Sequence, residues 1–348
     1  LDNRDPTSEE LNSMKLMVAE AMKDGALGIS TGLFYVPGSF STTNEVIELS
    51  KEASKYGGIY ISHMREEAGD ILKSINETIN IGISANIPVQ ITHHKIIGKS
   101  NWGLSTETLK LVDQAIAKGV RVSIDQYPYT ASQTSISALI PQWAQAGGRK
   151  ALLERINNPL TRQILIDGIV ERILFDRGGG HPKNVVISKN TWDTTMEGKN
   201  LAELCADRQL DPSPANAALV VFEIIKGGGA SAVYHAINSN DVDLIMQHPM
   251  TSIASDGPMT VFGVGSPHPR TYGTFARVLG SYVRERNILS LEEAVRKMTS
   301  LPAQILSIKQ RGLIKEGYYA DIAIFDPKTI LDKATFEDPH QYAIGVIS

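Results

Sequence analysis

Two stretches of the sequence, Gly58-Ile-Tyr-Ile-Ser-His63 and Ile87-Pro-Val-Gln-Ile-Thr-His93, decide how the fold is interpreted. Each is a run of apolar and β-branched residues, which is typical of a buried strand, and each ends in a histidine. The two histidines are 30 residues apart, about the length of one β-α-β repeat. We therefore expect His63 and His93 at the carboxyl ends of neighbouring parallel strands, where α/β barrels carry their active sites.

A shared metal ion is the function that this placement favours. Neutral imidazoles leaving adjacent strand ends suit zinc and related divalent ions. An isolated histidine is more often a structural residue with a satisfied hydrogen bond, and that is the alternative for each of the two. Their matched positions in successive repeats favour ligands, so we predict that His63 and His93 bind zinc or another divalent metal. His94 faces the other way if the strand persists, and we leave it out of the site.

Strands and helices alternate on both sides of these stretches. Thr7 and Glu10 have the pattern of a capping box before a helix that Gly25 is placed to end. The predicted strands are residues 26–31, 58–63, 87–93 and 120–127, with helical patterns and glycine stops between them. This regular alternation predicts parallel strands and an α/β fold.

The alternation of strands and helices is interrupted from about residue 137. Residues 137–183 look like an insertion over the mouth of a barrel, suited to a lid or a substrate wall. Two short strands follow at 184–188 and 231–237, and the sequence leaves open which of them closes the barrel. Residues 250–257 form the last predicted inward strand, and 311–326 are interpreted as short β strands that leave the barrel.

Asp256 ends that last inward strand and is followed by a glycine and a proline. With His63 and His93 it makes a constellation suited to metal-assisted hydrolysis of an amide. The metal would polarise the scissile carbonyl and lower the pKa of a bound water toward ~7. Asp256 would then take the proton of the water and return it to the leaving nitrogen. The alternative for Asp256 is a turn-capping residue before Gly257.

Two cations are candidates for substrate binding. Lys95 lies just beyond His93, and Arg270 has the planar fork that holds a carboxylate with two hydrogen bonds. An ordinary surface salt bridge is the alternative for both. Tyr127, Tyr129 and Trp102 are candidates for the pocket wall, as much as for recognition.

Composition excludes several other classes of function. The chain has 348 residues, 42% of them hydrophobic. Its net charge of −4 provides no excess of positive charge that would attract nucleic acid or anionic lipid. No run of 18 apolar residues predicts a membrane span. The single cysteine, Cys205, cannot form an internal disulfide, which favours a reducing, cytoplasmic setting. We expect a small molecule as partner, and the oligomeric state stays open.

Several motifs together resemble the N-acyl-D-amino-acid deacylase (D-aminoacylase) group of the metal-dependent amidohydrolase superfamily. They occur in the expected order over practically the whole chain: GALGISTGLFYVPGSFSTTNEV (25–46), YISHMREE (60–67), QITHHKIIGKSNWG (90–103), SIDQYPYTAS (123–132), IASDGP (253–258), HPRTYGTFARVLG (268–280) and RGLIKEGYYADIAIFDP (311–327). The resemblance implies a zinc-dependent enzyme with a (β/α)8 TIM barrel and a small β-sandwich. It also implies hydrolysis of N-acyl-D-amino acids to a carboxylate and a D-amino acid.

The resemblance also implies roles for individual residues. His63 and His93 match the histidine ligands of the fourth and fifth barrel strands, and Asp256 matches the catalytic aspartate of the eighth. The positions that match substrate-binding residues are Tyr35, Lys95, Tyr127, Ser132 and Arg270. Of these, Arg270 is the best candidate for holding the α-carboxylate of the amino acid.

The chain departs from the family pattern at its start. Family members carry a His-x-His pair on the first barrel strand and a cysteine or carboxylate ligand on the second, whereas residues 1–62 contain no histidine. We expect that the first strands are missing and that the chain is truncated at both ends. Residues 1–300 would then be a partial barrel, with an insertion near 137–183, and 301–348 a segment of the sandwich. With two histidines and one aspartate left, we expect this chain alone to bind metal poorly and to be inactive.

Two other functions remain open. Within the same class of enzyme, the chain is compatible with a dipeptidase or a cyclic-amide hydrolase. Outside that class, it is compatible with an inactive barrel fragment that acts as a binding module.

Overall fold

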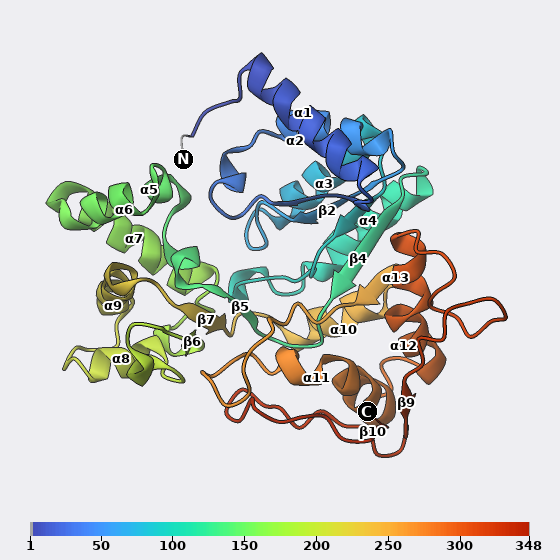
Figure 1. Cartoon of the computed structure of the whole chain (residues 1–348). Helices are drawn as coiled ribbons and strands as arrows, with labels where there is room; N and C mark the ends of the chain where they lie inside the picture. The colour runs from blue at the N-terminus through green and yellow to red at the C-terminus, as the bar shows by residue number, and fades with distance from the viewer. Residues whose placement is uncertain (1–2, 348) are drawn as a thin grey trace.

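A parallel sheet organises the first part of the molecule. The computed structural model describes residues 3–347 (Figure 1). The strands β1 (Gly28–Gly32), β2 (Ile59–His63), β3 (Val89–Ile91), β4 (Val122–Gln126) and β8 (Thr251–Ile253) lie in the order β1-β2-β3-β4-β8. All neighbouring pairs are parallel, with Gly32 opposite His63 and Ser62 opposite Ile91. The predicted α/β class with a parallel central sheet is therefore confirmed.

The connecting helices pack side by side in the order of the strands that they accompany. They are α1 (Ser8–Lys23), α2 (Thr43–Ser54), α3 (Ile71–Ala85), α4 (Ser105–Ala117) and α10 (Ser239–Gln247). The predicted capping box is present, because the Thr7 hydroxyl accepts from the Glu10 amide at 3.2 Å and the Glu10 carboxylate accepts from the Thr7 amide at 2.8 Å. A core of branched apolar side chains, including Ile75, Val89 and Ile91, fills the space between this layer and the sheet.

We expect the two isoleucines Ile75 and Ile83 of helix α3 to respond very differently to truncation. Ile75 is fully buried in the core, whereas Ile83 is 57% exposed. Ile75→Ala should lower the free energy of unfolding by about 2–5 kcal/mol, because it removes three carbons from a close-packed site. Ile83→Ala should stay within about 0.5 kcal/mol of the wild type. Chemical denaturation of both variants measures the difference, and equal losses would contradict this assignment of the core face.

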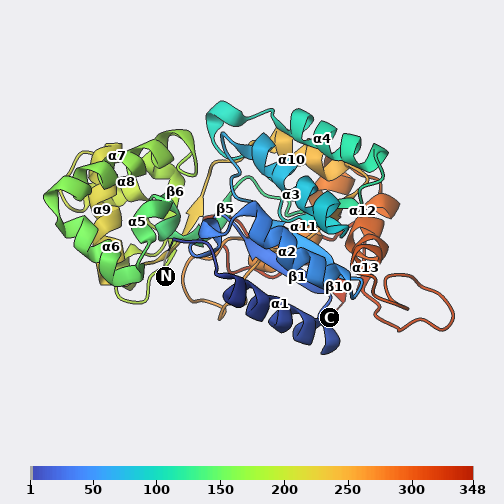
Figure 2. The ribbon, with the colours of Figure 1, turned by 90° about the horizontal axis from the view of Figure 1, so that it is seen from above.

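A second lobe is built around an antiparallel sheet, β5-β7-β6, of the strands β5 (Ser132–Ser135), β6 (Val185–Lys189) and β7 (Ser231–Tyr234). Its helices are α5 (Gln142–Gln145), α6 (Gly148–Asn157), α7 (Pro159–Phe175), α8 (Leu201–Ala206) and α9 (Pro214–Gly227). Figure 2 shows them gathered on one side of the molecule, away from α1 to α4. The pairing answers the question that the sequence left open, because both short strands join this lobe and neither joins the parallel sheet.

The C-terminal part packs against strand β8 of the sheet. It contains α11 (Arg270–Arg277), the π-helix η6 (Val278–Glu285), α12 (Leu291–Met298), α13 (Ser300–Ile305) and the antiparallel pair β9 (Ile324–Phe325) and β10 (Val346–Ile347). Of the strands expected over 311–326, the described chain forms only β9. Gly312 and Gly317 have φ values of +82° and +79°, a turn conformation that interrupts extended backbone there.

Short 3₁₀ helices complete the described elements. They are η1 (Gly38–Phe40), η2 (Lys99–Asn101), η3 (Ile136–Leu139), η4 (Pro182–Asn184) and η5 (Thr194–Met196). Over residues 3–347, no helix combines the length and the apolar character that crossing a bilayer requires.

Candidate metal centre and substrate pocket

The two predicted histidine ligands meet at the carboxyl ends of neighbouring strands. His63 is the last residue of β2, and His93 follows β3 by two residues. Nδ1 of His63 lies 2.7 Å from Nε2 of His93, and the ring centroids are 4.4 Å apart. His93 has a φ of +40°, a conformation that non-glycine residues seldom adopt and that often marks a functional position. Within the described residues, the buried Nε2 of His63 has no hydrogen-bond partner.

A third group, the carboxylate of Glu67, completes this cluster. Its side chain is 0% exposed, and its oxygens lie 3.6 Å from His63 Nε2 and 3.3 Å from His93 Nδ1. One ligand atom each from His63, Glu67 and His93 lie within 4.8 Å of one another. Glu67 is not among the site residues predicted from the sequence, although a carboxylate four residues after a histidine at a strand end is a usable signal.

This donor set fits a divalent metal. Two imidazoles and one carboxylate are the protein ligands of many catalytic zinc sites, which keep a further position open. Burial, together with the positive charges of Lys95 and Arg177, holds the pKa of His63 well below its usual value, even though Glu67 opposes the shift. His63 is therefore neutral, which is the form that binds metal.

Two cations compensate the charge of Glu67. Lys95 Nζ lies 2.5 Å from Glu67 Oε1 and 2.7 Å from His93 Nδ1, and Arg177 Nη2 lies 3.2 Å from Glu67 Oε2. Burial alone would raise the pKa of Glu67, but Lys95 and the two imidazoles together hold it well below its usual range. Lys95 is only 5% exposed, so it does not belong to an ordinary surface salt bridge.

Arg177 reaches the cluster from the second lobe, just after helix α7, and its guanidinium lies 3.9 Å from the centroid of the Phe34 ring. Arg177→Met should lower the free energy of unfolding by roughly 3 kcal/mol, because it removes one partner of a buried ion pair. Arg208→Met is the matched control, since the pair of Arg208 with Glu223 is partly exposed and should cost less than about 1 kcal/mol. Urea denaturation measures both, and similar losses would contradict a structural role for Arg177.

The backbone of His93 is held by Asp125 of strand β4. Asp125 Oδ1 accepts a hydrogen bond from the His93 amide at 2.5 Å, and Oδ2 accepts one from Gln90. The bond to the amide holds the backbone of His93 in its turn of positive φ. His94, by contrast, points away from the cluster and contacts Thr108 Oγ1 through Nε2 at 2.8 Å. His94 thus lies outside the cluster, as predicted.

Asp256 and Arg270 form the second part of the site. Asp256 lies three residues beyond β8 with a φ of +47°, and its Oδ2 is 2.9 Å from Arg270 Nη1. Arg270 is 3% exposed and therefore not part of a surface salt bridge. Both residues line a cavity of about 480 Å³, together with Gln133 and Thr134 of β5. The structure thus groups Glu67, and not Asp256, with the two histidines in the metal-binding cluster.

Tyr127 connects the two parts. The guanidinium of Arg270 lies 4.5 Å from the centroid of its ring, and Lys95 Nζ lies 5.7 Å from the same centroid. The ring is buried, and in the described part of the chain its hydroxyl has no hydrogen-bond partner. Burial raises the pKa of this hydroxyl above its usual value, so Tyr127 stays protonated and able to donate a hydrogen bond.

The remaining candidates differ in how they relate to the site. The Tyr35 ring lies 4.7 Å from the His63 ring, and the Tyr35 hydroxyl contacts Thr134 at 2.9 Å. Ser132 is buried at the start of β5, beside Gln133 of the cavity wall, and its hydroxyl has no partner among residues 3–347. Tyr129 packs against His268, and Trp102 donates to the Ala236 carbonyl at 3.0 Å, so the structure joins neither to the metal-binding cluster.

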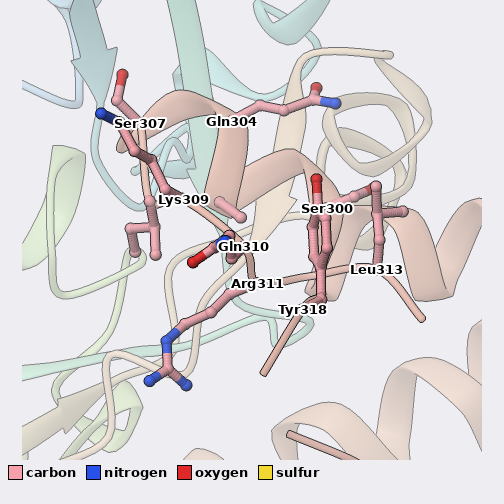
Figure 3. Close-up of a pocket in the computed structure, with 10 residues that line it drawn as sticks. Ser300, Gln304, Ser307, Lys309, Gln310, Arg311, Leu313 and Tyr318 are labelled. Atoms are coloured by element: carbon pink, nitrogen blue, oxygen red, sulfur yellow. The ribbon is translucent and has the colours of Figure 1, made fainter. Parts of the chain in front are cut away.

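A pocket of about 440 Å³ is formed by residues of helix α13 and of the segment just beyond it (Figure 3). Gln304 and Ser307 line it, and they also line a neighbouring pocket beneath Ile59 and Met250, where strands of the sheet begin. The amino-terminal end of such a sheet serves stability and not chemistry. This pocket is therefore not a candidate active site.

Known proteins are similar to this chain over nearly its whole length. A D-aminoacylase of Alcaligenes xylosoxydans xylosoxydans is 36% identical over 99% of this chain and 61% of its own length. A solved D-aminoacylase, whose binuclear metal centre has been described, superposes with a TM-score of 0.80 at 34% identity, over 99% of this chain and 62% of that one. The N-acyl-D-glutamate deacylase of Bordetella bronchiseptica, solved with zinc and a phosphonate mimic of the tetrahedral intermediate, gives 0.80 at 31% identity, over 99% and 63%.

A family model also matches part of the chain. The sequence model of the amidohydrolase family matches residues 222–348. The chain is a homologue of the N-acyl-D-amino-acid deacylases over nearly its whole length, as its motifs indicated. It spans about three fifths of the length of the curated relatives that it matches.

Proposed function

We propose that the protein hydrolyses the amide bond of N-acyl-D-amino acids and releases a carboxylate and a D-amino acid. One observation carries the proposal: His63, Glu67 and His93 converge at the carboxyl ends of β2 and β3, beside a cavity that presents Asp256 and Arg270. The likeness to D-aminoacylases supports the substrate class.

His63, Glu67 and His93 are the residues that we propose to hold the metal, which we take to be zinc or another divalent ion. Such an ion, when bound, polarises a carbonyl oxygen and lowers the pKa of water. The expectation of poor metal binding rested on two histidines and one aspartate. Glu67 now supplies a third donor within the cluster, so we replace that expectation by a proposed single metal site.

Arg270 is placed to bind the α-carboxylate of the substrate. Its Nε and Nη1 are buried and, over residues 3–347, have no partner with hydrogen-bond geometry, although Nη1 forms the ion pair with Asp256. A bidentate carboxylate would satisfy such donors. Tyr127 stacks beneath the guanidinium and limits its rotation. We propose Tyr35, Lys95 and Ser132 as further substrate contacts along the cavity and the cluster.

Asp256 is the proposed general base and acid. Its side chain is 42% exposed and reaches the cavity, so a water molecule has access to it. The carboxylate accepts the proton of the attacking water and returns it to the leaving nitrogen, which departs as the amine of the D-amino acid. The ion pair with Arg270 orients the carboxylate before the substrate binds.

The finer architecture is part of the same proposal. We infer that the parallel sheet belongs to a (β/α)8 TIM barrel whose first strands are missing here. We also infer that residues 1–300 are the barrel, with the insertion, and that 301–348 contribute to a small β-sandwich. The cytoplasmic location favoured by the single cysteine stays a prediction.

The rate of amide hydrolysis by the zinc-loaded protein tests the proposed function. N-acetyl-D-leucine should be hydrolysed faster than N-acetyl-L-leucine, a D-dipeptide or a hydantoin. A preference for the dipeptide or the hydantoin would replace the proposal by a dipeptidase or a cyclic-amide hydrolase. Equal background rates for the wild type and Asp256→Asn on all four compounds would favour an inactive binding module.

A further inference from the structure

The imidazole of His268 joins two walls of the proposed substrate cavity. His268 is 0% exposed and lies two residues before Arg270. Its Nε2 is 2.9 Å from the Ala131 carbonyl oxygen, and its Nδ1 is 3.0 Å from the backbone nitrogen of Arg270. A carbonyl can only accept and an amide can only donate, so Nε2 carries the proton and Nδ1 accepts.

These two hydrogen bonds connect different parts of the molecule. Ala131 directly precedes Ser132 at the start of β5, in the second lobe, whereas Arg270 begins helix α11. The first amides of a helix lack an intrahelical acceptor, and α11 has no side-chain cap at Pro269. His268 therefore supplies the acceptor that fixes the start of α11, and it ties that start to the β5 wall.

The ring itself is held in place by aromatic neighbours. Tyr129 and Phe336 contact it edge to face at centroid distances of 5.0 and 4.9 Å. Burial and the nearby charge of Arg270 hold the pKa of His268 well below its usual value, so the imidazole stays neutral. A neutral ring offers one donor and one acceptor, which is what its two partners need.

We propose that His268 is a positioning residue for substrate binding: it sets the guanidinium of Arg270 in register with Ser132 and Tyr127, and so fixes where the substrate carboxylate lies. The proposal rests on the proposed function of Arg270. In this role His268 does not contact the reacting atoms and does not bind the metal. Its loss should therefore weaken substrate binding more than it slows the chemical step.

Two substitutions separate the two hydrogen bonds. His268→Phe keeps the packing against Tyr129 and Phe336 but loses both bonds. His268→Asn keeps an oxygen that can accept from the amide two residues on, as in an Asx turn, but loses the bond to Ala131. His235→Phe is the control, because His235 also packs on Phe336, at 4.7 Å, but does not bridge Ala131 and Arg270.

The test is steady-state kinetics of the zinc-loaded protein with N-acetyl-D-leucine. We expect His268→Phe to raise KM about tenfold with kcat changed less than about threefold, since it loses two hydrogen bonds that hold Arg270. His268→Asn should raise KM less, and His235→Phe should leave it unchanged. Adding Arg270→Lys to His268→Phe should raise KM by less than Arg270→Lys does alone, while zinc per chain stays constant.

An unchanged KM in His268→Phe would overturn the proposal, and so would equal effects of this substitution on kcat and KM. Additive effects of His268→Phe and Arg270→Lys on KM would overturn it as well. If the wild type does not hydrolyse N-acetyl-D-leucine, the proposed function fails on its own. The positioning role is then decided by the crystal structure of His268→Phe. Movement of the Arg270 guanidinium from its place 4.5 Å from the Tyr127 ring centroid supports the role, and an unmoved guanidinium rejects it.

Discussion

His93→Asn should lower kcat/KM for N-acetyl-D-leucine by roughly a thousandfold or more, since loss of the metal would remove several kcal/mol of transition-state stabilisation. His93 is the group on which the site converges: its ring contacts His63, Glu67 and Lys95, and Asp125 holds its backbone. Asparagine cannot supply a nitrogen ligand at the position of the imidazole. We therefore expect zinc affinity to fall together with activity, as measured by metal analysis after dialysis.

The neighbouring His94 is the control for this substitution. His94 is buried like His93, but it faces Thr108 of α4 and lies outside the metal-binding cluster. His94→Asn should retain zinc, whatever it costs in stability. Equal zinc contents in His93→Asn and the wild type would contradict the assignment of His93 as a ligand, even if activity were lost.

Asp256→Asn should lower kcat by a factor of about 10² to 10⁴, the usual contribution of a positioned general acid and base. Asparagine nearly preserves the shape of the side chain but cannot take the proton of the attacking water. Zinc content should be unchanged, because the metal-binding cluster consists of His63, Glu67 and His93. KM should also change, since Asp256 pairs with Arg270. The measurement is kcat and KM beside metal content.

Asp70→Asn is the matched control for Asp256→Asn. Asp70 is an exposed carboxylate at the start of α3 and pairs with Lys73 at the surface. Its substitution should leave kcat within experimental error of the wild type. A similar kcat for Asp256→Asn and Asp70→Asn would remove Asp256 from the mechanism.

The sequence was sufficient to predict the parallel sheet and the meeting of His63 with His93. Both depend on local patterns: runs of β-branched residues, glycine stops and the spacing of one β-α-β repeat. The strand boundaries were less predictable, since β3 ends at Ile91 and His93 lies in a turn with positive φ. That turn depends on Asp125, a residue of the next strand.

Contacts between distant segments were not predictable from local patterns. Arg177 lies 110 residues from Glu67 in the chain, and its burial depends on how the second lobe packs against the sheet. The same holds for β7, whose pairing with both β5 and β6 is known only once the lobe is folded. Glu67 was missed for another reason: it follows another glutamate, Glu66, in a loop where acidic residues are usually solvated.

The proposed metal centre is tested most directly by a titration of the metal-free protein with zinc, by calorimetry, for the wild type, Glu67→Gln and His93→Asn. We expect one zinc per wild-type chain. The affinity should be lower by at least about tenfold in Glu67→Gln, and lower still in His93→Asn. Binding of no zinc by the wild type, or the same affinity in all three proteins, would contradict the proposed metal centre.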